Sequence, residues 1–470
     1  MKQFLRNLKV VSILLVLLVA FLMVGLLVQQ KRSQRELSVA VGENKQALRQ
    51  RYMRAGSIYS ADGVILAHSK NGEREYAADP ALARACLHLV GDYTHRLPYG
   101  IESVYMPELL GTSRSFFTQL FLDFKKQGFT GNDLILTVDS KLMLKADSLL
   151  SDYSGSIVMF NYRSGDILAL VSSPRLYPQD VIDWTNIVDS SLFNRALHGR
   201  YLPGSTFKII PTAALLSDGK LDVTMTVDCK GKEPIVPAGA KETLTPKGHG
   251  RVGLAQAFPK SCNAFFGQLA VELGRERLLE QAESFGFNQE LFIDRLKVAT
   301  STIDLTEPGI GALSWVGVGQ PIGRDRLTLS PVHLAMLSGA IANEGVLMKP
   351  HLLRQEIDPT GVAGRERESE QYSICCDQHI AAAIEKLMLD TVSSGTGKRA
   401  YRDGLEIAGK TGTAEMIDSD GKSVVNSLFT GYLISETHPI AIAVVLEDEN
   451  RAAAQLAGDL LSYAAKLDLP

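Results

Sequence analysis

The placement of five strand-like segments most constrains what this chain can fold into. Apolar, β-favouring residues lie at both ends of the stretch from residue 156 to residue 446, whereas the patterning over about 203–286 is mostly helical. Strands at both ends of one stretch, with helices between them, favour one mixed sheet covered by a helical lobe. Such an architecture forms a cleft where sheet and lobe meet. The five segments are 156–160, 166–172, 405–413, 428–434 and 440–446.

Shorter elements flank this stretch on both sides. Residues 134–138 are strand-like, and helices are expected over 141–150 and 452–466. Residues 56–67 predict two short strands around an Asp62-Gly63 turn. From there to about residue 130, short elements alternate with Gly and Pro, which indicates a small α+β module.

The N-terminus carries a long apolar run. Residues 10–28 contain no charge, and only Ser12 and Gly25 interrupt the aliphatic and aromatic side chains. Nineteen helical residues at about 1.5 Å each nearly match a hydrocarbon layer of roughly 30 Å. A cleaved signal peptide is the alternative, but the run is long for one and has no A-x-A-like site after it. We expect a signal-anchor and three parts: a cytoplasmic tail and membrane span (1–33), an N-terminal pedestal (34–130) and a main domain (131–470).

Charge and cysteine usage exclude several classes of function. The net charge of −3, without blocks of like charge, argues against a nucleic-acid binder. The histidines show no H-E-x-x-H or comparable spacing, and the cysteines no C-x-x-C pair, so we expect neither a metal nor a disulfide framework. The five cysteines, expected as free and mostly buried thiols, are Cys86, Cys229, Cys262, Cys375 and Cys376.

One of three S-x-x-K matches has a context that suits catalysis. Ser205 and Lys208 lie in a Pro203-Gly204-Ser205 turn that leads into an apolar segment, so an i, i+3 spacing would place both side chains on one helical face. A helix N-terminus there would favour developing negative charge. Pro211 should kink or tighten the second turn. The other two matches contain Asp-Gly, which is turn chemistry that would misalign the pair; they are Ser217/Lys220 and Ser419/Lys422.

A serine of this kind needs a base that is neutral at working pH. Burial and a second cation both lower the pKa of a lysine, and Lys410 in Lys410-Thr411-Gly412-Thr413 is the candidate second cation. That segment ends an expected strand. Gly412 would let a substrate approach the backbone, while Lys410 and Thr413 would offer donors to a carboxylate.

Ser261-Cys262-Asn263 is the third element of the constellation. We expect it on a helical segment, with a hydroxyl that could relay a proton and an amide that could hold a peptide bond. Cys262 has no histidine partner in view, so we interpret it as a filler that points away from the cleft. Each motif alone is weak, but the three occur in order with spacings that leave room for a helical lobe.

In this order the set resembles the penicillin-recognising serine transferases, and specifically the monofunctional class B penicillin-binding proteins. Further short segments typical of the family extend the resemblance over nearly the whole chain. They are Gly165-Asp166-Ile167-Leu168-Ala169-Leu170-Val171-Ser172-Ser173-Pro174, Asn194-Arg195-Ala196, Gly317-Val318-Gly319-Gln320, Leu329-Ser330-Pro331 and Gly395-Thr396-Gly397.

The resemblance implies a fold and a reaction. The fold would be mixed α/β, with an antiparallel five-stranded sheet, helices on both sides and an all-helical lobe, plus the small α+β pedestal and one transmembrane helix. The reaction would be cross-linking of peptidoglycan by a D,D-transpeptidase that β-lactams acylate, without a cofactor. The implied catalytic residues are Ser205, Lys208, Ser261 and Lys410, the substrate-binding residues Asn263, Thr411, Gly412 and Thr413, and the oxyanion-hole donors the backbone N–H groups of Ser205 and Thr413.

The resemblance also implies a place and partners. The catalytic domain would lie on the extracytoplasmic side of a bacterial cytoplasmic membrane, anchored by a single transmembrane span. Its substrates would be stem peptides, and its partner a SEDS-type polytopic glycosyltransferase. Two alternatives stay open: a β-lactamase or D,D-carboxypeptidase, which gives the acyl group to water, and a β-lactam sensor or non-catalytic division scaffold. The anchor and pedestal argue against a secreted hydrolase, and the complete set of motifs argues against a scaffold.

Overall fold

The computed structural model of this protein describes residues 7, 9, 12–25, 45–113, 130–188, 190–241, 247–417, 423–449 and 452–469. Residues 12–25 are helical, and the rest of the expected span, 10–11 and 26–28, lies outside the described residues. Among the residues that are described, no helix is both long and apolar enough to cross a membrane.

A five-stranded sheet forms the centre of the molecule. Its order is β16-β17-β18-β5-β6, and every neighbouring pair is antiparallel, which confirms the expected sheet. Strands from the two ends of the main domain meet where β18 pairs with β5. This order leaves β16 at one edge of the sheet. The strands are β5 (Gly155–Asn161), β6 (Ile167–Ser173), β16 (Ile407–Ile417), β17 (Ser423–Leu433) and β18 (Ile440–Leu446).

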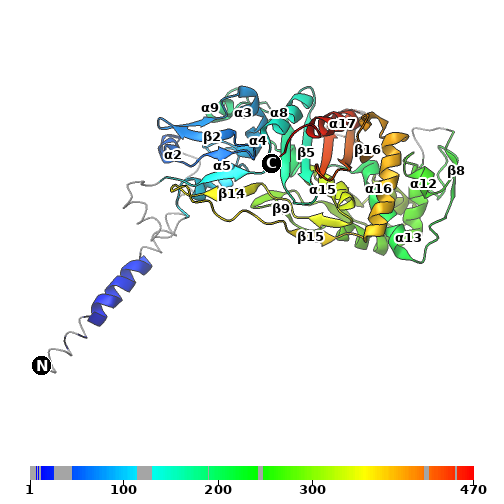
Figure 1. The fold of residues 1–470 in the computed structure, drawn as a ribbon. Coiled ribbons are helices and arrows are strands. Elements are labelled where there is room, and N and C mark those ends of the chain that lie inside the picture. Colours follow the sequence, from blue (N-terminus) through cyan, green and yellow to red (C-terminus); the bar gives the residue numbers. More distant parts are fainter. Residues whose placement is uncertain are drawn as a thin grey trace.

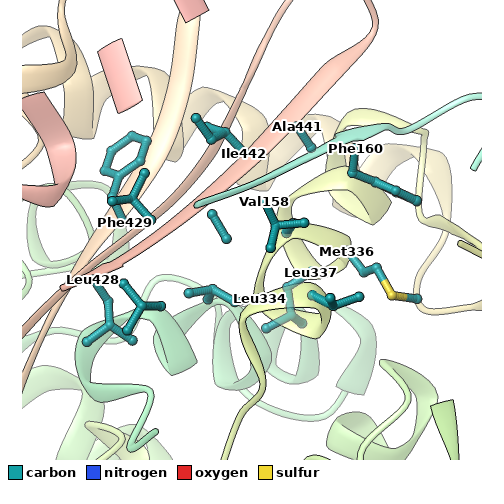
Figure 2. Close-up of a cluster of buried hydrophobic side chains, with 14 of the residues drawn as sticks. Val158, Phe160, Leu334, Met336, Leu337, Leu428, Phe429, Ala441 and Ile442 are labelled. Carbon is teal, nitrogen blue, oxygen red and sulfur yellow. The ribbon is translucent and has the colours of Figure 1, made fainter. Parts of the chain in front are cut away.

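Helices cover both faces of this sheet. On one face α15 (Pro331–Ala342) packs against β5, β17 and β18, and Figure 2 shows Leu334 and Leu337 gathered there with Val158 and Leu428. On the other face α17 (Ala453–Ala464) packs against β17 and β18, and α8 (Ser140–Leu149) packs against β6. Successive side chains of a strand point to opposite faces of the sheet. The apolar strand β18 therefore packs side chains against the helices on both faces.

A helical lobe stands at the β16 end of the sheet, as Figure 1 shows. It contains α11 (Ile209–Asp218), α13 (Asn263–Ser284), α14 (Ile310–Gly317) and α16 (Gln378–Ser393), and α13 packs against both α11 and α14. The segment expected to be mostly helical also holds a two-stranded ribbon, β7 (Val227–Cys229) with β8 (Gly250–Val252). Glycine and proline punctuation between these strands interrupts helix formation, so that part of the prediction was wrong.

The N-terminal module has a sheet of its own, at the other end of the molecule in Figure 1. Its order is β14-β4-β1-β2-β3, and the predicted hairpin is present as β1 (Ile58–Tyr59) paired with β2 (Ile65–Lys70). Strand β14 (Leu353–Ile357) comes from far along the chain and pairs with β4 (Asp133–Leu136). The Asp62 carboxylate accepts hydrogen bonds from the backbone N–H and hydroxyl of Ser140, 3.0 and 2.6 Å away.

One continuous apolar core runs from this module through the central sheet into the helical lobe. The N-terminal sheet and the main domain therefore pack together around a shared core, which holds the central sheet and the helical lobe in fixed positions. The other elements are β3 (Glu73–Tyr76), α2 (Lys45–Tyr52), α3 (Pro80–Ala85), α4 (Leu87–Val90), α5 (Ile101–Val104), α6 (Met106–Leu109), α9 (Pro178–Asp183), α10 (Arg195–His198), η1 (Gly204–Lys208), α12 (Leu254–Ala257), β9 (Leu291–Ile293), β10 (Leu296–Val298), β11 (Thr302–Asp304), β12 (Arg326–Thr328), β13 (Val346–Met348), β15 (Gln371–Ile374) and η2 (Lys398–Ala400).

Candidate active site

Ser205 lies in a tight turn rather than in a regular α-helix. Residues Gly204–Lys208 form the 3₁₀ helix η1, and α11 begins only at Ile209. Pro211 therefore falls in the first turn of α11, where its missing N–H costs little, and the expected kink is replaced by this change of helix type. In a 3₁₀ helix residues i and i+3 are eclipsed, so Ser205 and Lys208 share one side of the turn.

Close backbone contacts fix the turn against strand β16. Gly204 has a φ of +51°, and a Cβ there would lie 2.5 Å from the carbonyl oxygen of Thr413. Its N–H donates to the carbonyl of Gly319, 3.1 Å away. Only glycine adopts this left-handed backbone easily and also fits where there is no room for a Cβ. Pro203-Gly204 therefore determines how close Ser205 lies to strand β16.

Lys208 is fully buried and points toward the third motif. Its Nζ donates to the carbonyl oxygen of Ser261 at 2.7 Å, to the Ser261 hydroxyl at 3.1 Å and to Oδ1 of Asn263 at 2.8 Å. The ring of Phe266 lies beneath it, with the centroid 5.4 Å from Nζ. These three hydrogen bonds hold the buried amine in one place.

Lys410 reaches the same hydroxyl from the sheet. This residue of β16 is also fully buried, and its Nζ donates to Oγ of Ser261 at 3.0 Å and to the carbonyl of Thr411 at 3.2 Å. Burial, and after it the charge of Lys208, lower the pKa of Lys410 well below its ordinary value. The structure thus brings together the two lysines that the sequence argument paired, with one serine hydroxyl between them.

Ser261 is not on a helix, contrary to the sequence expectation. It lies in the turn between α12 and α13 with a φ of +56°, and Asn263 is the first residue of α13. The N–H of Ser261 donates to the carbonyl of Phe258, which closes the turn. A left-handed serine is uncommon, and here the conformation turns its hydroxyl toward Lys208 and Lys410.

Lys410-Thr411-Gly412-Thr413 lies inside β16 and not at the end of a strand, contrary to the sequence expectation, because pairing with β17 continues to Ile417. Register with β17 pairs Gly412 with Leu428 and Thr413 with Ser427, while the Thr411 hydroxyl lies 2.7 Å from that of Thr396. A Cβ on Gly412 would lie 2.8 Å from the carbonyl of Pro203, so the close packing of η1 on β16 needs a glycine here.

These residues line one cleft of about 420 Å³ between sheet and lobe. Its walls include six of the eight predicted site residues: Ser205, Ser261, Asn263, Thr411, Gly412 and Thr413. The other two, Lys208 and Lys410, lie beneath the cleft and contact it through the Ser261 hydroxyl. Further residues line the cleft that were not predicted as site residues, among them Lys260, Trp315, Gln320, Thr396, Lys398 and Arg399. Two of these had a signal in the sequence: Gln320 lies in Gly317-Val318-Gly319-Gln320, and Thr396 lies in Gly395-Thr396-Gly397.

Other features of the chain are weaker candidates for an active site. A larger hollow of about 1080 Å³, lined by Tyr201 and Glu447 among others, contains none of the predicted site residues. Ser217 is exposed on α11, and the Ser419/Lys422 match lies outside the described residues. Burial raises the pKa of the Cys262 thiol to about 12, which suits the interpretation that it is not a nucleophile.

Comparison with known proteins gives one matching family and several relatives. The family described as penicillin binding protein transpeptidase domain matches residues 155–462, more than half of the chain. The chain is 29% identical over 438 residues to the peptidoglycan D,D-transpeptidase PbpA of Mycolicibacterium smegmatis, covering 86% of each protein. It is 29% identical over 367 residues to the peptidoglycan D,D-transpeptidase MrdA of Acinetobacter baumannii, which is 72% of this chain and only 55% of MrdA.

A solved structure resembles most of this chain. The ceftriaxone acyl-enzyme complex of penicillin-binding protein A from M. tuberculosis superposes with a TM-score of 0.79 at 26% sequence identity. This match covers 89% of the present chain and 100% of the other. The likeness extends over the N-terminal module as well as the matched domain, because the matched domain begins only at residue 155.

Proposed function

The chain belongs to the family of penicillin-binding protein transpeptidase domains, and from this membership we propose that it is a peptidoglycan D,D-transpeptidase of the monofunctional class B group. The observation that carries the proposal is the shared hydroxyl of Ser261, which accepts hydrogen bonds from both buried lysines beside the cleft that Ser205 lines. Two relatives whose names state this activity support it.

The first step is acylation of Ser205. Its hydroxyl oxygen attacks the carbonyl carbon between the two terminal D-alanines of a stem peptide, and Lys208 accepts the hydroxyl proton. The developing oxyanion is held by the backbone N–H groups of Ser205 and Thr413, each worth about 3 to 4 kcal/mol in comparable sites. The close approach of Gly204 to the Thr413 backbone supports this proposal, because it holds the turn that carries Ser205 against the segment that carries Thr413.

The second step releases D-alanine. As the carbon–nitrogen bond breaks, the leaving nitrogen takes a proton from the Ser261 hydroxyl, and a lysine Nζ replaces that proton. Having Lys208 and Lys410 both within 3.1 Å of this hydroxyl gives the relay a donor whichever lysine is protonated. Protonating both buried lysines at once is costly, which favours a state with one neutral amine.

Substrate binding uses the edge of the sheet. Because β16 is an edge strand, an extended stem peptide can lie along its outer edge near Gly412. Thr411 and Thr413 receive the terminal carboxylate, Lys410 beneath them supplies a positive charge when it is protonated, and Asn263 holds the donor peptide bond. The acyl-enzyme then passes its acyl group to an amine of a neighbouring stem peptide, while a β-lactam imitates the D-Ala-D-Ala end and stops at the ester.

The test is covalent labelling of the detergent-solubilised full chain with a fluorescent penicillin, followed by digestion and mass spectrometry. We expect long-lived label on Ser205 that disappears in Ser205→Ala. The matched control is Ser217→Ala, which alters the exposed serine of another S-x-x-K match and should label normally.

Two other outcomes would redirect the assignment. Rapid loss of label with accumulation of hydrolysed drug would indicate a β-lactamase, in which water replaces the acceptor amine. A folded protein that never labels would leave the non-catalytic scaffold.

The proposal extends to the location of the protein. The charge-free run over residues 10–28, of which 12–25 are helical, supports a single span that anchors the chain in a bacterial cytoplasmic membrane. The pedestal (34–130) and catalytic domain (131–470) would then lie on the extracytoplasmic side, where peptidoglycan is cross-linked. Contact of the anchor and pedestal with a SEDS-type glycosyltransferase is tested by two-hybrid pairing of the full chain with such a partner, because strands β4 and β14 complete the N-terminal sheet.

A further inference from the structure

One glutamine connects the end of helix α14 with strand β16. Nε2 of Gln320 donates a hydrogen bond to the carbonyl oxygen of Thr413, 3.3 Å away. Gln320 is half-buried and lines the same cleft as Ser205. The proposed reaction steps give this glutamine no role, although its side chain contacts the backbone of a proposed oxyanion-hole residue.

The backbone at the end of α14 fixes the position of Gln320. Its N–H donates to the carbonyl of Trp315, 3.1 Å away. The N–H of Gly319, which has a φ of +77°, donates to the carbonyl of Val316 at 2.8 Å. These two bonds around a left-handed glycine form the Schellman motif that ends many helices. The residue after such a glycine is often apolar and packs back on the helix, whereas Gln320 reaches to another element.

The same helix end packs on the turn that carries Ser205. The carbonyl of Gly319 accepts a hydrogen bond from the N–H of Gly204 at 3.1 Å. A Cβ on Gly319 would lie 1.9 Å from the carbonyl oxygen of Gly204, so no larger residue fits between the two segments. The end of α14 therefore contacts the Ser205 turn through Gly319 and strand β16 through Gln320.

The geometry of β16 relates the contacted carbonyl to the Thr413 N–H. In an antiparallel pair, the N–H and C=O of one residue point to the same side of the strand, because hydrogen-bonded partners exchange both bonds. The Thr413 carbonyl faces Gln320 and Gly204, which belong to the lobe and not to β17. Since β16 is an edge strand, the Thr413 N–H points to this open edge as well.

We propose that Gln320 is a positioning residue for the oxyanion hole. By holding the carbonyl of Thr413, it fixes the rotation of the strand at this residue and thus the direction of the Thr413 N–H. This role rests on the proposed function, in which that N–H stabilises the oxyanion formed on the substrate carbonyl. A donor that is aligned beforehand needs no reorganisation as the negative charge develops.

The first test uses Gln320→Leu in the detergent-solubilised full chain, because leucine is of similar size but cannot donate. The rate constant for acylation of Ser205 by a fluorescent penicillin should fall about 5- to 20-fold. Loss of an oxyanion donor itself costs about 10²- to 10³-fold, and one supporting hydrogen bond contributes less. The dissociation constant of the penicillin before acylation should change less than about twofold, since the N–H acts mainly on the transition state.

The second test observes the oxyanion hole directly. Infrared difference spectra are recorded on the acyl-enzyme formed with a penicillin that carries ¹³C at its β-lactam carbonyl. Hydrogen bonds from the oxyanion hole lower the stretching frequency of the ester carbonyl, so its band should move to higher frequency in Gln320→Leu. A change in overall stability alone would not move this band.

Gln268→Leu is the matched control. Gln268 is also a half-buried glutamine of the helical lobe, but it lies on α13, donates to Glu272 and does not line the cleft. This variant should match the wild-type chain in acylation rate and in carbonyl frequency.

Three results would overturn the proposal. The first is an unshifted carbonyl band in folded Gln320→Leu, and the second is an acylation rate within about twofold of the wild-type rate. The third is a rise in the dissociation constant that explains the whole loss, because Gln320 would then bind substrate itself. If thermal unfolding shows that Gln320→Leu is not folded, Gln320→Glu decides in the same assays, since a carboxylate keeps the shape but cannot donate. A wild-type chain that forms no acyl-enzyme would instead contradict the proposed function, and this role with it.

Discussion

Replacing Ser261 by alanine removes the hydroxyl to which both buried lysines donate. Lys208 keeps two other acceptors, the Ser261 carbonyl at 2.7 Å and Oδ1 of Asn263 at 2.8 Å, so the proposed base stays in place. Lys410 keeps the carbonyl of Thr411 at 3.2 Å. The change therefore affects the proton relay more than the position of the base.

The size of the effect follows from these contacts. Loss of a positioned proton-transfer group costs about 10²- to 10⁴-fold in rate. Because Lys208 is still anchored, we expect the lower part of this range, about 10²- to 10³-fold or roughly 3 to 4 kcal/mol in the barrier. Losing an acceptor for two buried amines should also lower the free energy of unfolding by about 1 to 3 kcal/mol.

The assay is the rate constant for acylation of Ser205 by a fluorescent penicillin, followed by intact-protein mass spectrometry. Thermal unfolding of each variant shows whether it is folded at the assay temperature. Ser217→Ala serves again as the control and should acylate at the wild-type rate.

One result would refute the reasoning about the relay. If folded Ser261→Ala acylates within about threefold of the wild-type rate, the hydroxyl does not carry the proton, and the two lysines share it for structural reasons alone.

Three further predictions concern pH and packing. Burial and the charge of Lys208 lower the pKa of Lys410, so between that lowered pKa and 10.5 the unfolded chain binds more protons than the folded one. The free energy of unfolding should therefore rise with pH across this interval. Measured by urea unfolding from pH 7 to 10, it should depend less on pH in Lys410→Met than in the wild-type chain. Burial lowers the pKa of His333 from 6.5 to about 4, so stability should fall by roughly 3 kcal/mol as the pH drops through this window, and His333→Gln should lose less over the same acid titration. Gly412→Ala places a Cβ 2.8 Å from the Pro203 carbonyl, so it should lower the free energy of unfolding by about 1 to 3 kcal/mol and slow the acylation of Ser205. Unchanged stability and an unchanged acylation rate would show that η1 can shift away from β16.

Local patterns in the sequence predicted the elements that build the site. The turn at Pro203-Gly204 and the strand that carries Lys410 are both present, although this strand extends past the predicted end at Thr413 to Ile417. Ser261 was misplaced on a helix, since nothing in its immediate sequence signals a left-handed serine. That conformation is held by contacts with Lys208 and Lys410, which lie 53 and 149 residues away along the chain.

The side chains of Cys229, His249 and Cys262 illustrate the same limit, because their sulfur and ring nitrogen atoms lie within 4.8 Å of one another. A search for short ligand spacings misses Cys229, His249 and Cys262, because 20 and 13 residues separate them. Their meeting depends on the ribbon register and on the packing of β7 against α13.

The sequence by itself predicted a sheet whose strands come from both ends of the main domain, and it singled out Ser205, Lys208, Ser261 and Lys410 as the candidate reactive groups. Only the tertiary structure decided that two lysines from different elements share one hydroxyl, that β14 returns to complete the N-terminal sheet, and that three thiol and imidazole donors converge behind Ser261. Backbone preferences act over a few residues and can be read in the sequence. Proximity between distant side chains, and the pKa shift of Lys410 that follows from it, arises only when the packed core fixes the path of the chain.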